Sequence, residues 1–117
     1  MRWLAILISV IGAAAMADPP EIRAVDATMS EGTWRFDVTL LHPDSGWDHY
    51  ADAWEVRTPD GTLIGTRTLA HPHVNEQPFT RSLGALKIPA GLDEVIIRAQ
   101  CSVDGWSAHE TRVPLKN

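Results

Sequence analysis

Short stretches of alternating apolar and polar residues, separated by turn signals roughly every 8–15 residues, constrain this chain most strongly. After residue 17, no segment has the apolar spacing of a sustained amphipathic helix. The clearest alternating stretch is 33–42, whose apolar side chains share one face: Trp34, Phe36, Val38 and Leu40. Alternation of this kind places one face of a strand against a core and the other in solvent. The sequence therefore predicts an all-β fold.

Seven strands are expected. They fall at residues 22–28, 33–42, 51–57, 62–69, 79–88, 94–101 and 109–113. Between the third and fourth, Thr58-Pro59-Asp60-Gly61 predicts a tight turn, because proline presets φ at its second position and glycine accepts a positive φ. Seven short strands in about 95 residues are typical of an antiparallel, immunoglobulin-like (fibronectin III-like) β-sandwich. Trp54, on the third strand, is expected to pack between the two sheets.

The first 17 residues have the pattern of a cleavable signal peptide. Arg2 precedes an apolar run over 3–14, and Ala15-Met16-Ala17 supplies the small-x-small cleavage pattern. The run is shorter than the roughly 20 apolar residues of a membrane span, and the residue directly after the cleavage point is Asp18 rather than a cysteine that could carry a lipid. We therefore expect a mature domain over 18–117 that is periplasmic or secreted, with no membrane span after signal cleavage.

The net charge and the cysteine content exclude some partners and some kinds of cross-link. The chain has 15 acidic and 10 basic side chains, a net charge of −5, and no Lys/Arg cluster. Nucleic acid is therefore not an expected partner. Cys101 is the only cysteine, so no internal disulfide can form. Its thiol is expected to be either a buried, inert side chain or a metal ligand.

Histidines concentrate in three predicted loops. In an antiparallel sandwich, alternate loops lie at the same end, which here groups 42–50, 70–78 and 102–108. All five histidines lie in or beside these loops: His42, His49, His71, His73 and His109. Imidazole, carboxylate and thiolate groups are ligands of transition metals. The sequence therefore predicts a metal site drawn from His42, His49, His71, His73, Cys101 and Asp104.

Two of these loops resemble the metal-binding motifs of the superoxide reductase (desulfoferrodoxin/neelaredoxin) family. Residues 42–50 read His-Pro-Asp-Ser-Gly-Trp-Asp-His-Tyr and are followed by Trp54-Glu55-Val56, similar to the family's His-Pro, acid, His-Tyr and Trp-Ile-Glu pattern. Residues 101–106 read Cys-Ser-Val-Asp-Gly-Trp, similar to its Cys-x-x-His-Gly-x-Trp motif. The first motif has one extra residue between its histidines, and the tryptophan of the second comes one position early.

The resemblance implies an immunoglobulin-like sandwich with an open iron site made by four histidines and one cysteine thiolate. By match of position, His42 and His49 correspond to two histidine ligands and Cys101 to the thiolate, while Asp104 stands where the family has a histidine. No histidine occurs between residues 18 and 41, so His71 or His73 would have to replace the missing ligands. Iron is the metal that the resemblance favours, and copper and zinc also suit these donors.

A second hypothesis is a non-catalytic accessory domain that contacts a periplasmic protein partner and binds no metal. Trp47 and Trp106 lie in the histidine-bearing loops, where they would contact a partner, wall a ligand pocket or cap the core. The histidines would then be incidental or would respond to pH. Whether the chain is an enzyme stays open. The resemblance implies one-electron reduction of superoxide at an iron site, whereas the sequence contains no catalytic triad order, nucleophile elbow or phosphate-binding loop.

Overall fold

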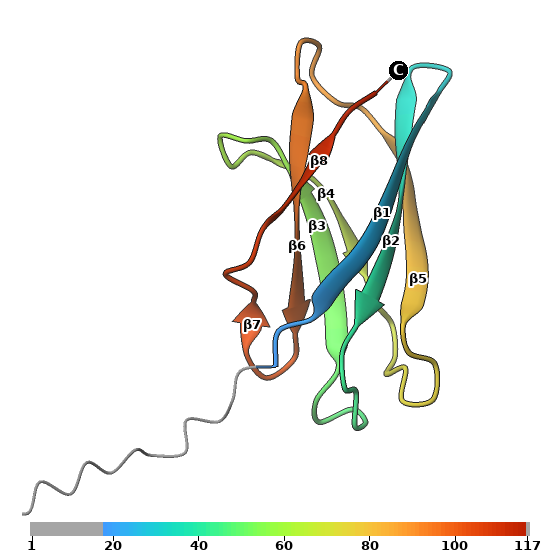
Figure 1. Cartoon of the computed structure of the whole chain (residues 1–117), viewed down its shortest axis with the longest axis vertical. Coiled ribbons are helices and arrows are strands. Elements are labelled where there is room, and N and C mark those ends of the chain that lie inside the picture. The colour runs from blue at the N-terminus through green and yellow to red at the C-terminus, as the bar shows by residue number, and fades with distance from the viewer. Residues whose placement is uncertain (1–17, 117) are drawn as a thin grey trace, which may run out of the picture.

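The computed structural model of this protein describes residues 18–116, which fold into two antiparallel β-sheets packed face to face (Figure 1). Eight strands make up the sheets: β1 (Glu21–Ser30), β2 (Thr33–Leu41), β3 (Ala51–Arg57), β4 (Leu63–Thr68), β5 (Phe79–Leu86), β6 (Glu94–Cys101), β7 (Gly105–Trp106) and β8 (Thr111–Pro114). The expected signal peptide, residues 1–17, lies outside the described residues.

The first sheet has the strand order β1-β2-β5, and the second has the order β4-β3-β6, with both β7 and β8 paired to β6. Each of these pairings is antiparallel. The all-β sandwich expected from the sequence is therefore confirmed, and the seven expected strands are all found, with ends that differ by a few residues. The additional strand is β7, a two-residue pairing inside the segment that was expected to be a loop.

The core lies between the sheets and is built by the alternation seen in the sequence. Phe36, Val38 and Leu40 of β2 are fully buried against Val95 and Ile97 of β6. Trp54 is also fully buried, as expected for the aromatic residue that packs between the sheets. Burying large side chains of this kind contributes about 1.5–3 kcal/mol each, so this core fixes the sandwich on which the loops are carried.

The turn at Thr58-Pro59-Asp60-Gly61 forms as expected. The Gly61 amide donates to the Thr58 carbonyl at 2.9 Å, and Gly61 has a φ of 94°. The segments that follow β2, β4 and β6 lie together at the opposite end of the sandwich (Figure 1). The inference that the three histidine-bearing loops share one end is therefore confirmed.

Candidate metal centre

His42 follows β2 directly and is fully buried at the end of the core. Its Nδ1 lies 2.5 Å from Oδ1 of Asp44, whose side chain is also completely buried. Asp44 accepts two further hydrogen bonds, from the backbone amides of Ala51 at 2.9 Å and His73 at 2.8 Å. A carboxylate held in this way orients the imidazole: Nδ1 donates to Asp44, which leaves the lone pair of a neutral ring on Nε2.

The Nε2 atom of His42 is buried and has no hydrogen-bond partner among residues 18–116. A buried polar atom without a partner costs about 1–3 kcal/mol, and such atoms are rare in folded proteins. Here the unpaired atom is also a ring nitrogen with its lone pair available. It is therefore an atom to which a ligand could bind.

His49 is held by a tight turn in the segment between β2 and β3. The His49 amide donates to the carbonyl of Gly46 at 3.2 Å, and the amide of Ser45 donates to the carbonyl of His49 at 3.0 Å. Gly46 adopts a φ of 147°, which other residues rarely adopt. The turn brings the two imidazoles edge to face, with ring centroids 4.8 Å apart.

Cys101 is the last residue of β6 and is buried. It pairs with Ala51 across the sheet, and the amide of Ser102 donates to the carbonyl of Tyr50 at 2.9 Å, so the end of β6 is fixed beside the start of β3. Burial raises the pKa of the Cys101 thiol above its ordinary value; the backbone amide of Asp104 opposes this shift, while the Asp104 side chain adds to it. A thiolate at this position therefore needs a cation beside it.

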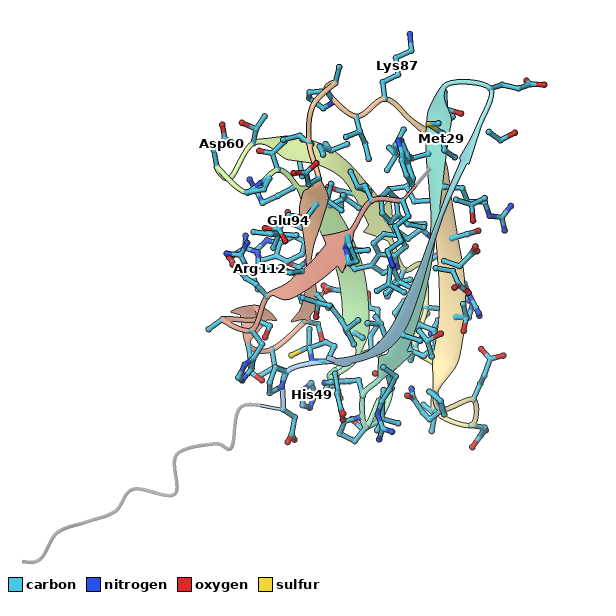
Figure 2. All side chains as sticks on the ribbon, turned by 45° about the horizontal axis from the view of Figure 1, so that its top comes forward. Met29, His49, Asp60, Lys87, Glu94 and Arg112 are labelled. Carbon is cyan, nitrogen blue, oxygen red and sulfur yellow. The ribbon has the colours of Figure 1, made fainter. Side chains whose placement is uncertain are left out.

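Two imidazoles and one thiol meet at this end of the sandwich. The ligand atoms of His42, His49 and Cys101 all lie within 4.8 Å of one another. Sγ of Cys101 is 3.5 Å from Nε2 of His49, a separation close to the roughly 3.5–3.7 Å expected of two ligands that bind one metal at about 2.3 Å and 2.0 Å. Figure 2 shows His49 at the end of the molecule opposite Asp60, Met29 and Lys87. The three donors thus have the chemistry and spacing of a small metal site.

The other expected ligands are not part of this three-residue group. Asp104 contacts the thiol, with Oδ2 3.4 Å from Sγ, and its amide donates to Sγ at 3.2 Å. His73 stacks on Phe79 at 3.9 Å between ring centroids, and its Nε2 lies 2.8 Å from the guanidinium of Arg81. His71 packs against His73, with centroids 4.5 Å apart. Of the six expected residues, three converge, one touches the thiol, and two form a separate histidine pair.

Two buried acids were not among the predicted site residues. Asp44, which orients His42, lies inside the first motif, and its position two residues after a histidine was the available signal. Glu55 is buried on β3, where its carboxylate accepts from Nε of Arg57 at 2.6 Å and Nε of Arg98 at 2.8 Å. Burial opposes ionisation of Glu55, but these hydrogen bonds and charges outweigh it and lower its pKa.

The fold and this group of donors define the protein as a small β-sandwich with a His-His-Cys cluster at one end. No protein-family model matches the chain. A protein of Halomicrobium mukohataei described as a "Putative lipoprotein" is 39% identical to it over 92 residues, which cover 76% of this chain and 45% of the relative. The chain thus spans less than half the length of that relative.

A structural comparison supports the fold alone. The crystal structure of a hypothetical protein from Pyrococcus horikoshii OT3 matches with a TM-score of 0.55 and 13% sequence identity, over 84% of this chain and 88% of the other. Within residues 18–116 there is no helix with the length and apolar composition that crossing a bilayer requires.

Proposed function

We propose that this chain is an exported protein that binds one transition-metal ion through His42, His49 and Cys101. The observation that carries the proposal is the unpaired Nε2 of His42, buried within 4.8 Å of the other two donors and oriented by Asp44. Histidine ligands of metals commonly donate their second ring nitrogen to a carboxylate in this way. Export is supported by the pattern of residues 2–17 and by the name of the relative from Halomicrobium mukohataei, a "Putative lipoprotein".

The resemblance to superoxide reductases gives independent support. The three side chains that meet are the same three that its motifs match to ligands, although 52 residues separate His49 from Cys101 in the chain. An iron ion with imidazole and thiolate ligands would supply one-electron redox chemistry. The three-residue group provides three of the five donors of that family's iron site, so the group fits an altered relative of the family better than an intact iron site.

Metal analysis of the purified chain over residues 18–117 tests the proposal. We expect about one equivalent of a transition metal, retained after gel filtration and lost when Cys101→Ala is combined with His49→Ala. Arg35→Ala, an exposed change on β2 far from the cluster, is the matched control for handling. Less than a tenth of an equivalent in the unaltered chain, with no binding on titration with copper, zinc or iron, would contradict the proposal.

A metal-free accessory domain is the second candidate, because Trp47 exposes 68% of its surface beside the cluster. A large exposed aromatic of this kind often anchors a protein partner. This candidate predicts that His49→Ala leaves partner capture unchanged, whereas Trp47→Ala abolishes it.

A further inference from the structure

The electrostatics of the loops around the cluster bear on which ligand reaches it. Of the three donors, His42 and Cys101 are buried and His49 is half-buried, so solvent reaches the cluster at His49. Asp48, next to His49 in the chain, and Asp104, which contacts the thiol, are both exposed. We propose that the ligand this centre receives from solution is a copper ion, attracted by an acidic entrance that repels small anions such as superoxide. This proposal rests on the metal site proposed above and names the metal and its route.

The donor set is the first argument for copper. Two imidazoles and one thiolate in a three-coordinate arrangement are typical of copper sites, whereas iron and zinc sites usually add further protein ligands or water. His71 and His73, the remaining histidines of the neighbouring loop, are engaged with each other, with Phe79 and with Arg81 rather than with the cluster. For donors of this type, copper also binds more tightly than the other divalent first-row metals.

The charge of the entrance is the second argument. Asp104 places its Oδ2 3.4 Å from the Cys101 sulfur, and a second exposed acid, Asp48, directly precedes the donor His49 in the chain. Segments 42–50 and 102–104 contain no lysine or arginine. In the chain over residues 18–117, the positive α-amino group of Asp18 lies 3.3 Å from Oδ2 of Asp104, and the exposed carboxylate of Asp18 itself offsets that charge. Segment 70–78 also contains no lysine or arginine. At the start of β5, the guanidinium of Arg81 pairs with the carboxylate of Glu76 at 3.0 Å.

The other basic residues are paired or lie farther away. The Arg98 guanidinium lies 5.2 Å from the ring of Trp106, which is in the same segment as Asp104, but it pairs with Glu55 at 2.8 Å. Lys87 stands at the far end of the molecule, opposite His49 (Figure 2), and Arg112 on β8 pairs with Glu94 on β6. A cleft lined by one sign of charge raises the local concentration and association rate of an oppositely charged ligand. The same field lowers the association rate of a small anion, so the entrance favours a metal cation over superoxide.

Uptake involves no change of oxidation state. The S–H bond of Cys101 breaks, its proton passes to solvent or buffer, and a sulfur–copper bond forms, while the Nε2 atoms of His42 and His49 donate their lone pairs. Asp104 already accepts from the thiol and lies at the exposed side, where it can receive the proton first.

Stopped-flow mixing of the chain over residues 18–117 with copper(II) sulfate tests the route. We expect the rate at which the thiolate–copper absorption appears to fall as sodium chloride is raised from about 10 mM to about 0.5 M, because the Debye length shrinks from about 30 Å to below 8 Å. Asp48→Asn should slow uptake several-fold at low salt. Glu31→Gln, which removes the same charge in the β1–β2 turn at the opposite end, should leave the rate unchanged.

A competition experiment tests the choice of metal. The apoprotein is mixed with equal amounts of copper, zinc and iron(II) without oxygen and desalted, and the retained metal is measured. We expect about tenfold more copper than zinc or iron, with the copper lost in Cys101→Ser. Retention of zinc or iron instead, or an uptake rate that rises with salt or ignores it, overturns this inference while leaving the metal site standing. Retention of no metal overturns the proposed function itself.

Discussion

Asp44 is the residue whose removal should most damage both the fold and the centre. Its buried carboxylate accepts hydrogen bonds from Nδ1 of His42 and from the backbone amides of Ala51 and His73. These bonds connect the end of β2 to the start of β3 and to segment 70–78. A buried donor left without its acceptor costs about 1–3 kcal/mol, and Asp44→Ala leaves these three donors without theirs, a loss of at least about 3 kcal/mol. A domain of this size has a free energy of unfolding of about 5–15 kcal/mol. Asp44→Ala should therefore remove a large share of the stability.

Thermal unfolding followed by circular dichroism measures this loss. At about 4–8 °C per kcal/mol, Asp44→Ala should lower the Tm by about 15–30 °C. Asp44→Asn keeps one acceptor oxygen, so it should lose about 1–3 kcal/mol and weaken metal binding about 10–100-fold. Asp48→Ala, an exposed change in the same loop, should alter stability by less than about 0.5 kcal/mol. A Tm for Asp44→Ala within about 3 °C of the unaltered protein would refute the view that this carboxylate holds the three segments together.

Two other changes test the electrostatics and the surface. The pKa of Glu55 is lowered in the folded state from its ordinary value of 4.5, so the unfolded chain binds this proton more readily. The stability that ionised Glu55 contributes is therefore present above pH 4.5 and is lost as the pH falls below that value toward the folded-state pKa. Urea titrations between pH 3 and 6 should therefore show a shallower acid loss for Glu55→Gln, and an equally steep loss would count against the Arg57 and Arg98 pairing. Trp47→Ala should change the free energy of unfolding by less than about 1 kcal/mol, because Trp47 is 68% exposed and its main aromatic contact is Tyr50 at 5.6 Å. Trp54→Ala, its buried counterpart, should cost about 3–5 kcal/mol, and similar losses for the two variants would contradict the assignment of Trp47 to the surface.

The sequence predicted the sandwich because strands obey a local rule. A period of two places Phe36, Val38 and Leu40 on one face wherever the strand lies in space. A second rule, the alternating direction of strands in an antiparallel sandwich, fixes which loops share an end, so the grouping of the three loops also followed. The short β7 strand was missed because a two-residue pairing leaves no periodic signal.

The sequence alone could not decide which of the six predicted ligands meet, because that depends on contacts between distant segments. His42, His49 and Cys101 carry family-like motifs, and the motifs alone matched these three to ligands. His71 and His73 carry no such motif, and their exclusion depends on the stacking of His73 on Phe79 and on its contact with Arg81, a residue on another segment. Likewise, the role of Asp44 depends on the amides of Ala51 and His73, which only the folded chain brings to it.

The position of Asp18 affects how the protein should be prepared. Its backbone nitrogen lies 3.3 Å from Oδ2 of Asp104, the same oxygen that contacts the Cys101 thiol. A polyhistidine tag fused ahead of Asp18 would add imidazoles beside the donors and could bind the metal itself. The last described residues lie at the other end of the sandwich (Figure 1), so an affinity tag belongs after Asn117, and a start at Asp18 places only the α-amino group of that residue beside Asp104.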